Sequence, residues 1–235
     1  MIKNNKKRKF LRCALLVVVV FAVSFLVAAS SAILPKIIDT SGNKQTYATT
    51  EHGWNLILIN KDNLIPEDYE VKLLKLSNGE RVDERIYPDL QKMFDDARAS
   101  GLELFVAQGY RTADEQQKLL EDKQKAYENE GNSPAEAKEL AEKWVAVPGT
   151  SEHQLGIAVD INADDKKCDP DDVYKWLGRN AHKYGFINRY PADKTDITGI
   201  IYEPWHYRYV GTEAAKEIYE KGICLEEYIE QLETE

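Results

Sequence analysis

The stretch Ser151–Ile161, SEHQLGIAVDI, places a histidine before an apolar run and an aspartate, Asp160, inside that run. A carboxylate among aliphatic side chains is costly to desolvate, so it normally becomes neutral, gains a hydrogen-bonded partner or binds a metal. In a strand, Asp160 lies on the face opposite Val159 and Ile161. We therefore expect Asp160 to point away from the aliphatic layer and toward His153, with Gly156 allowing the backbone to bend between them.

A second polar group, EPWH at positions 203–206, supplies a further histidine. Two histidines and one carboxylate with an open coordination position form a common catalytic zinc site, in which the pKa of the bound water falls to about 7. This pattern predicts one Zn²⁺ ion held by His153, Asp160 and His206. Glu203, three residues before His206, is then placed to act as general base. Because Pro204 disfavours a helix, we expect a bend to bring Glu203 and His206 to one site.

The rest of the chain alternates between predicted strands and helices. The apolar spacing of Leu90, Met93, Phe94 and Ala97 predicts a core-packed helix. Capping boxes at Thr112 and Ser133 predict two more helices, the second ending at residues 147–149. Further strands are expected at 54–60, 102–107, 156–162 and 199–210, and further helices at 169–184 and in an amphipathic, solvated tail. Without a glycine-rich phosphate turn, this order predicts an α+β fold with a small antiparallel sheet and flanking helices.

The N-terminal segment has the pattern of a membrane anchor. Six Lys or Arg residues fall within residues 1–12, and 22 uncharged, largely apolar residues follow at 13–34. This predicts a cytoplasmic basic segment (1–12), a transmembrane helix (13–34), a stalk (35–53) and an extracytoplasmic catalytic domain (54–235). The small residues Ala28 to Ala32 leave open the alternative that this segment is a cleaved signal peptide and the protein is secreted.

Charge and cysteine content restrict the partners. Beyond residue 12 the chain carries 25 Lys and Arg against 40 Asp and Glu, a net charge of −15. Such a surface repels nucleic acid, so we predict no nucleic-acid partner. We also expect a monomer. Outside the predicted anchor there are two cysteines, Cys168 and Cys224. They are left open as either a disulfide or two free thiols.

Four motifs resemble those of VanY-like D-alanyl-D-alanine carboxypeptidases, zinc peptidases related to VanX, lysostaphin-type enzymes and Hedgehog. SEHQLGIAVD resembles their S-x-H-x-x-G-x-A-x-D motif and EPWH their E-x-W-H motif. GYRTADEQ and WNLILINKDNLIPEDY resemble two further segments of the family, in the same order along the chain. The resemblance implies a Hedgehog/DD-peptidase-like fold, one zinc ion on His153, Asp160 and His206, and Glu203 as the catalytic base.

The same resemblance implies that Arg111 meets charge on the substrate. It could dock the terminal carboxylate, which we favour because a carboxypeptidase must recognise a chain end, or it could stabilise the oxyanion formed during attack. Ser151 could hydrogen-bond the peptide or cap a turn. We expect Gln116 to brace the Arg111 loop.

The implied function is a membrane-anchored zinc carboxypeptidase that trims the C-terminal D-alanine from peptidoglycan stem peptides. Within the same fold, an L,D-carboxypeptidase or a peptidoglycan endopeptidase remains open. A non-haem iron site also uses two histidines and a carboxylate, but its usual spacing of two residues differs from the seven between His153 and Asp160. A non-catalytic zinc module is disfavoured by the presence of Glu203 and Arg111.

Overall fold

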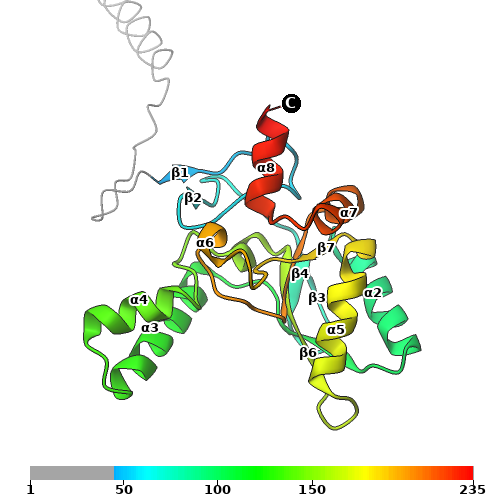
Figure 1. Ribbon diagram of the computed structural model, residues 1–235, viewed down its shortest axis with the longest axis horizontal. Helices are drawn as coiled ribbons and strands as arrows, with labels where there is room; N and C mark the ends of the chain where they lie inside the picture. Colours follow the sequence, from blue (N-terminus) through cyan, green and yellow to red (C-terminus); the bar gives the residue numbers. More distant parts are fainter. Residues whose placement is uncertain (1–44, 235) are drawn as a thin grey trace, which may run out of the picture. The chain divides into compact units, whose positions relative to one another are not determined.

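A four-stranded antiparallel sheet forms the centre of the computed structural model, which describes residues 45–234. Its strand order is β5 (Leu104–Gln108), β6 (Ala158–Ala163), β8 (His206–Tyr209) and β7 (Phe186–Asn188) (Figure 1). Each neighbouring pair is antiparallel. The predicted α+β class with a small antiparallel sheet is confirmed.

Helices pack around this sheet through their apolar faces. The helix α2 (Tyr87–Ala99) buries the four residues that the spacing predicts, and α5 (Pro170–Asn180) continues into the 3-10 turn η2 (Ala181–Tyr184). The helices α7 (Thr212–Lys221) and α8 (Leu225–Thr234) enclose a second apolar cluster with β7. Two cores therefore lie in one folded unit, with Phe186 of β7 in the first and Ile187 in the second.

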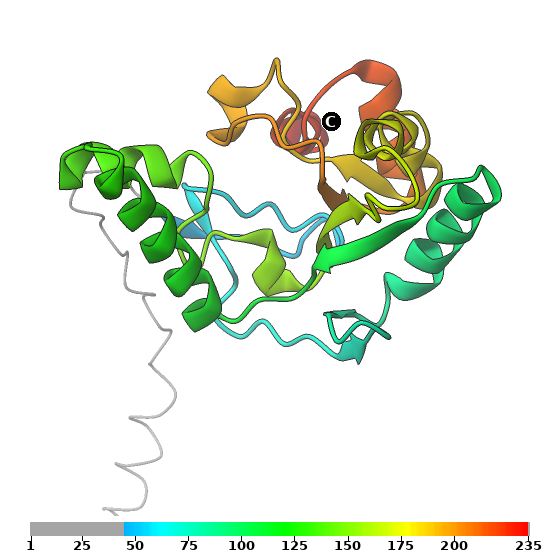
Figure 2. The same cartoon turned by 90° about the horizontal axis from the view of Figure 1, so that it is seen from below.

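The helices α3 (Ala113–Asn129) and α4 (Pro134–Glu142) form a hairpin apart from the others. Both begin at the predicted capping boxes, on Thr112 and Ser133. Figures 1 and 2 both place this hairpin at the opposite end of the folded unit from α2 and α5. The helix α4 ends at Glu142, before the predicted stop at residues 147–149, and residues 143–149 form a loop.

The predicted strand at residues 54–60 is wrong, and the structure shows why. Ile57 and Ile59 are buried in the main core, whereas Leu56 and Leu58 pack against the second cluster, so the sequence does alternate. The backbone pairs with a side chain instead of a strand, because Arg208 Nη2 donates to the carbonyls of Asn55 and Ile57.

Two short pairings precede the central sheet. β1 (Thr46–Tyr47) pairs in parallel with β2 (Asn63–Leu64), and β3 (Leu73–Lys75) forms a hairpin with β4 (Arg81–Asp83). β1 lies within the segment assigned to the stalk, so the folded unit includes residues before Trp54. The predicted anchor at 13–34 lies outside the described residues, and among residues 45–234 no helix has the length and apolarity to cross a membrane.

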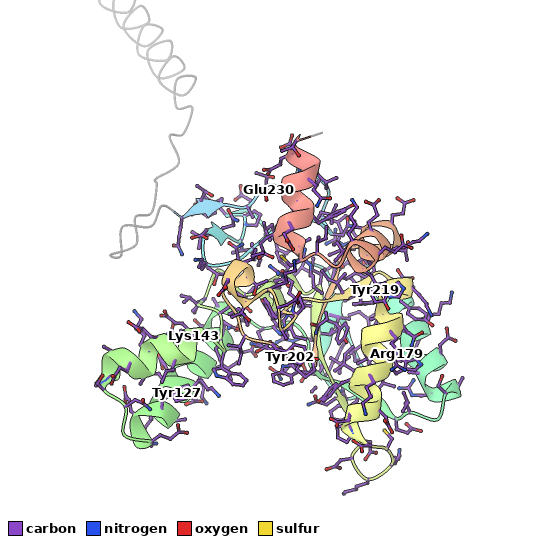
Figure 3. All side chains as sticks on the ribbon, viewed as in Figure 1. Tyr127, Lys143, Arg179, Tyr202, Tyr219 and Glu230 are labelled. Atoms are coloured by element: carbon purple, nitrogen blue, oxygen red, sulfur yellow. The ribbon has the colours of Figure 1, made fainter. Side chains whose placement is uncertain are left out.

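Two elements near the C-terminus differ from the expected pattern. The strand expected over 199–210 is confined to β8, because the short helix α6 (Thr195–Thr198) and an irregular loop carrying Pro204 precede it. The tail is helical as expected, and Glu230 on its outer face is exposed (Figure 3). Glu226, however, turns inward to pair with the fully buried Arg189, so α8 is not simply a solvated helix.

Candidate active site

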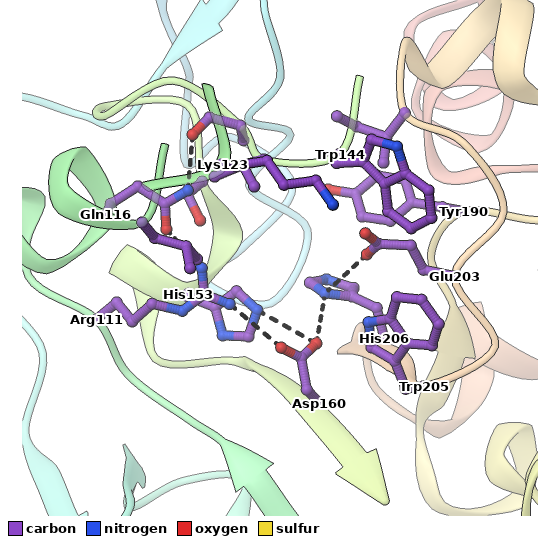
Figure 4. A pocket seen from close by; sticks show the side chains of 15 residues that line it. Arg111, Gln116, Lys123, Trp144, His153, Asp160, Tyr190, Glu203, Trp205 and His206 are labelled. Carbon is purple, nitrogen blue, oxygen red and sulfur yellow. Dashed lines mark hydrogen bonds and ion pairs between the residues drawn. The ribbon is translucent and has the colours of Figure 1, made fainter. Parts of the chain in front are cut away.

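The β6–β8 register brings the predicted metal ligands together. Asp160 lies directly opposite His206 in this pair of strands. His153 arrives from the 3-10 turn η1 (Glu152–Leu155), which Gly156 ends with a φ of 74° and returns to β6. His153, Asp160 and His206 offer ligand atoms that all lie within 4.8 Å of one another (Figure 4). The structure thus gathers the three residues predicted from two separate motifs.

The donor atoms of this cluster fit a zinc ion. His153 Nδ1 donates to the Gly109 carbonyl at 2.7 Å, which leaves Nε2 buried without a hydrogen-bond partner and 3.5 Å from Asp160 Oδ1. Burial, with Arg111 nearby, lowers the pKa of His153 to about 4, so it is neutral, as a ligand must be. His206 Nδ1 lies 3.0 Å from the same aspartate oxygen. Two imidazoles and one carboxylate form a donor set typical of catalytic zinc.

Glu203 lies beside this cluster on the loop ahead of β8. Its Oε2 is 3.8 Å from His206 Nδ1, and its carbonyl accepts a hydrogen bond of 2.7 Å from Asn188 Nδ2, which holds the loop in place. Burial, reinforced by the charge of Asp160, raises the pKa of Glu203 to about 7, although His206 and Arg111 oppose the shift. A carboxylate with this pKa can both accept and return a proton near neutral pH.

Arg111 contacts the metal cluster directly. Its Nη2 lies 3.2 Å from Asp160 Oδ2, and its Nη1 donates to Gln116 Oε1 at 2.7 Å. Gln116 Nε2 in turn donates to the Ala146 carbonyl at 2.6 Å, so the predicted bracing role of Gln116 is confirmed. With both terminal nitrogens engaged, Arg111 has its buried Nε left without a partner.

Ser151 lines the same cavity and is almost fully buried. It stands at the N-cap position of η1, but its side chain makes no capping hydrogen bond there. The structure thus shows no capping role for this hydroxyl at η1, and its contact with a bound peptide stays a prediction.

The α3–α4 hairpin and the loop after it form the opposite wall of the cavity, which sequence patterns did not identify. Trp144 stacks on Trp205 with ring centroids 6.5 Å apart, and Lys123 Nζ lies 4.5 Å from the centre of the Trp144 ring. Figure 4 shows Lys123 extending into the cavity, with Tyr190 on its far side. The cavity has a volume of about 250 Å³. The position of Lys123 in α3 does not reveal this role in the sequence. The role depends on the loop after α4, which brings Trp144 next to Lys123.

The other two histidines of the chain, His52 and His182, and the cysteines Cys168 and Cys224 lie outside the site. His182 stacks on Tyr219 with ring centroids 3.7 Å apart, and neither His182 nor the half-buried His52 lines the cavity. Cys168 and Cys224 are both free thiols, so the disulfide alternative is not realised. The Cys168 thiol donates to the Glu103 carbonyl at 3.3 Å instead.

Comparison with known proteins places these residues in a family context. A family model described as VanY, D-alanyl-D-alanine carboxypeptidase, matches residues 79–212. A D-alanyl-D-alanine carboxypeptidase of Enterococcus faecalis is 58% identical over 179 residues, which cover 76% of this chain and 67% of the relative.

Two solved structures are similar along the folded unit. VanYB in complex with D-alanine-D-alanine is 58% identical, with a TM-score of 0.75 and coverage of 75% of this chain and 98% of that one. A mutant of the D,D-pentapeptidase VanY from a VanB-type resistance cassette, in complex with Zn(II), is also 58% identical, with a TM-score of 0.74 and coverage of 75% and 99%. From the family match, the identity and the shared fold, this chain belongs to the VanY family of D-alanyl-D-alanine carboxypeptidases, which are zinc peptidases.

Proposed function

We propose that this protein removes the C-terminal D-alanine from peptidoglycan stem peptides, with His153, Asp160 and His206 holding one zinc ion. The observation that carries the proposal is the position of Glu203 and Arg111 on two sides of the three-ligand cluster in one cavity. When bound, zinc supplies a water of lowered pKa and polarises a carbonyl group. A structural zinc module needs neither residue.

The chain's own side chains account for the proton transfers and the charge. Glu203 takes the proton of the attacking water and passes it to the leaving amine, a role that its pKa of about 7 supports. The Arg111 guanidinium borders the cavity beside Asp160, with its Nη2 3.2 Å from Asp160 Oδ2, and this position supports a role in stabilising the oxyanion. Each terminal nitrogen of Arg111 already donates one hydrogen bond, to Gln116 or to Asp160, so a docking role would have to use the second N–H of each.

The terminal carboxylate then needs another partner. Among residues 45–234, Lys123 is the second cation that lines the cavity, and it makes no ion pair with a carboxylate there. We assign it, together with the Ser151 hydroxyl, to the substrate's chain end. This assignment favours a carboxypeptidase over an endopeptidase, because an internal bond presents no terminal charge.

The experiment that tests the function is metal analysis of the purified protein followed by digestion of a muramyl pentapeptide. A D,D-carboxypeptidase releases one D-alanine and yields the tetrapeptide, whereas an L,D-carboxypeptidase acts on the tetrapeptide and yields the tripeptide. Product mass separates these reactions and also identifies endopeptidase cleavage. A zinc-loaded protein that leaves the pentapeptide intact would contradict the proposal.

For its location, we propose a monomer anchored in the cell membrane by residues 13–34, with the catalytic domain on the outer face. The basic residues before position 13 and the 22 uncharged residues after it support this orientation. Protease added to intact cells should release the domain by cutting near residues 35–45. Resistance in intact cells with cleavage in permeabilised cells would contradict the orientation, and a mature chain beginning near residue 32 would favour secretion.

A further inference from the structure

A fully buried carboxylate, Glu152, lies directly behind the candidate metal ligands. Its Oε1 accepts hydrogen bonds from Arg189 Nε at 2.8 Å and from Arg208 Nη1 at 2.7 Å. Both arginine side chains are also fully buried. Buried ions of this kind are costly unless they are paired and hydrogen-bonded, so their retention calls for a role beyond packing.

The two arginines are held by other groups as well. Arg189 donates through both terminal nitrogens to Glu226 of α8, at 2.8 and 2.7 Å. Arg208 donates to the carbonyls of Tyr209, Asn55 and Ile57. Because the arginines are fixed in this way, the position of the Glu152 carboxylate is fixed too.

The second oxygen of Glu152 faces His206. Glu152 Oε2 has no hydrogen-bond partner and lies 3.7 Å from His206 Nε2, which is also buried without one. The separation is longer than a formed hydrogen bond, yet the two atoms are a donor and an acceptor that both lack a partner. Pairing them satisfies two buried polar atoms at once.

We propose that Glu152 is a positioning residue that holds the Nε2–H of His206 and thereby directs Nδ1 toward the metal. This inference rests on the metal site of the proposed function. A ligating histidine usually donates its second ring nitrogen to a carboxylate or carbonyl, which fixes its tautomer and orientation. His153 does so with the Gly109 carbonyl. Glu152 offers His206 a charged carboxylate acceptor in place of a carbonyl, which raises the basicity of His206 as a ligand.

The test compares Glu152→Gln with Glu226→Gln in the full-length chain. Both substitutions remove one carboxylate charge from the same buried network, but only Glu152 faces His206. Zinc affinity is measured by competition with a chelator, and the unfolding of the metal-free protein is followed in parallel. We expect Glu152→Gln to bind zinc about 10- to 100-fold more weakly. Glu226→Gln should stay near the wild-type affinity even where it unfolds more easily, because Arg208 still holds Glu152 and a glutamine oxygen can still accept from Arg189.

A spectroscopic measurement separates positioning from general stability. In the zinc-loaded wild type, the His206 Nε2–H should give a slowly exchanging proton signal correlated with its ring nitrogen. Glu152→Gln should shift this signal or lose it, whereas Glu226→Gln should keep it. Equal losses of zinc affinity in the two variants, or an unchanged signal in Glu152→Gln, would overturn the proposal.

If Glu152→Gln does not fold, Glu152→Asp replaces it, because it retains the charge that the two arginines need while shortening the reach toward His206. This variant should fold and still bind zinc more weakly than the wild type. Wild-type affinity in Glu152→Asp would overturn the proposal. A wild-type protein that binds no zinc would instead contradict the proposed function, so the two failures remain distinguishable.

Discussion

The two walls of the active-site cavity are built in different ways. On the sheet side, His153 and His206 are almost fully buried and rest on a network of buried charges. On the hairpin side, Leu119 and Trp144 are 40% and 36% exposed, and Lys123 lies over an aromatic ring without an ion-pair partner among the described residues. The groups that we propose for the chemistry are thus fixed by the core, whereas the hairpin groups that border the same cavity lie on an accessible surface.

This comparison predicts that substitutions on the sheet side abolish activity, while those on the hairpin side adjust substrate selection. The largest effect is expected for His206→Ala, which removes a ligand from the three-residue cluster. Zinc occupancy and activity should both be lost, since two remaining protein ligands bind zinc poorly. Metal analysis of the purified variant checks this. One tightly bound zinc in a folded His206→Ala protein would show that the ligand set is wrong.

Glu203→Gln should separate metal binding from catalysis. The variant keeps the size of the side chain and retains zinc, because Glu203 is not a member of the ligand cluster. Its kcat should fall by roughly 10²- to 10⁴-fold, since the proton acceptor is lost. Steady-state kinetics and zinc content, measured on the same sample, show whether activity is lost while zinc is retained. Near-normal turnover would rule out Glu203 as the base.

Arg111→Ala tests whether this arginine belongs to the chemistry or to substrate docking. Because its terminal nitrogens are held by Asp160 and Gln116, we expect kcat to fall by about 10²- to 10³-fold, as for loss of an oxyanion donor. Amidation of the peptide's C-terminus should then lower kcat/KM by the same factor in the variant and in the wild type. A higher KM with no amidation penalty in the variant would restore the docking role.

The pH dependence of kcat/KM reports the protonation state of the general base, Glu203. Burial raises the pKa of Glu203 to about 7 in the metal-free protein. A nearby zinc cation favours the carboxylate and moves this pKa downward. Since a protonated base is inactive, kcat/KM should fall about tenfold per pH unit below a midpoint at or under pH 7. The Glu203→Gln variant should lack this acid limb, and its persistence there would assign it to another group.

The smallest effect is expected on the hairpin wall. Lys123→Met keeps the apolar stem and removes the charge, so KM for a free-acid peptide should rise about fivefold, equivalent to roughly 1 kcal/mol for a partly exposed ion pair. The penalty should disappear with an amidated peptide. Lys125→Met is the matched control, because Lys125 is an exposed residue of the same helix. Equal behaviour of the two variants would remove Lys123 from substrate recognition.

Much of this protein was determined by local sequence. The capping boxes at Thr112 and Ser133 and the apolar spacing in α2 depend on contacts within one or two helical turns. The two boxes predicted where α3 and α4 begin, and the spacing predicted the buried face of α2. The candidate metal ligands at positions 153, 160 and 206 could also be predicted from the sequence, because only a few residue types can coordinate zinc. Asp160 in an apolar strand was the strongest of these signals.

Tertiary structure decided what depended on distant segments. The β6–β8 register sets Asp160 opposite His206, 46 positions away, and only folding could place Glu152 behind that histidine. The alternating residues 54–60 fail to form a strand because Arg208 takes their carbonyl groups. Local rules describe neighbours along the chain, whereas hydrogen-bond competition and the pairing of buried charges are settled by groups that meet only once the core has formed.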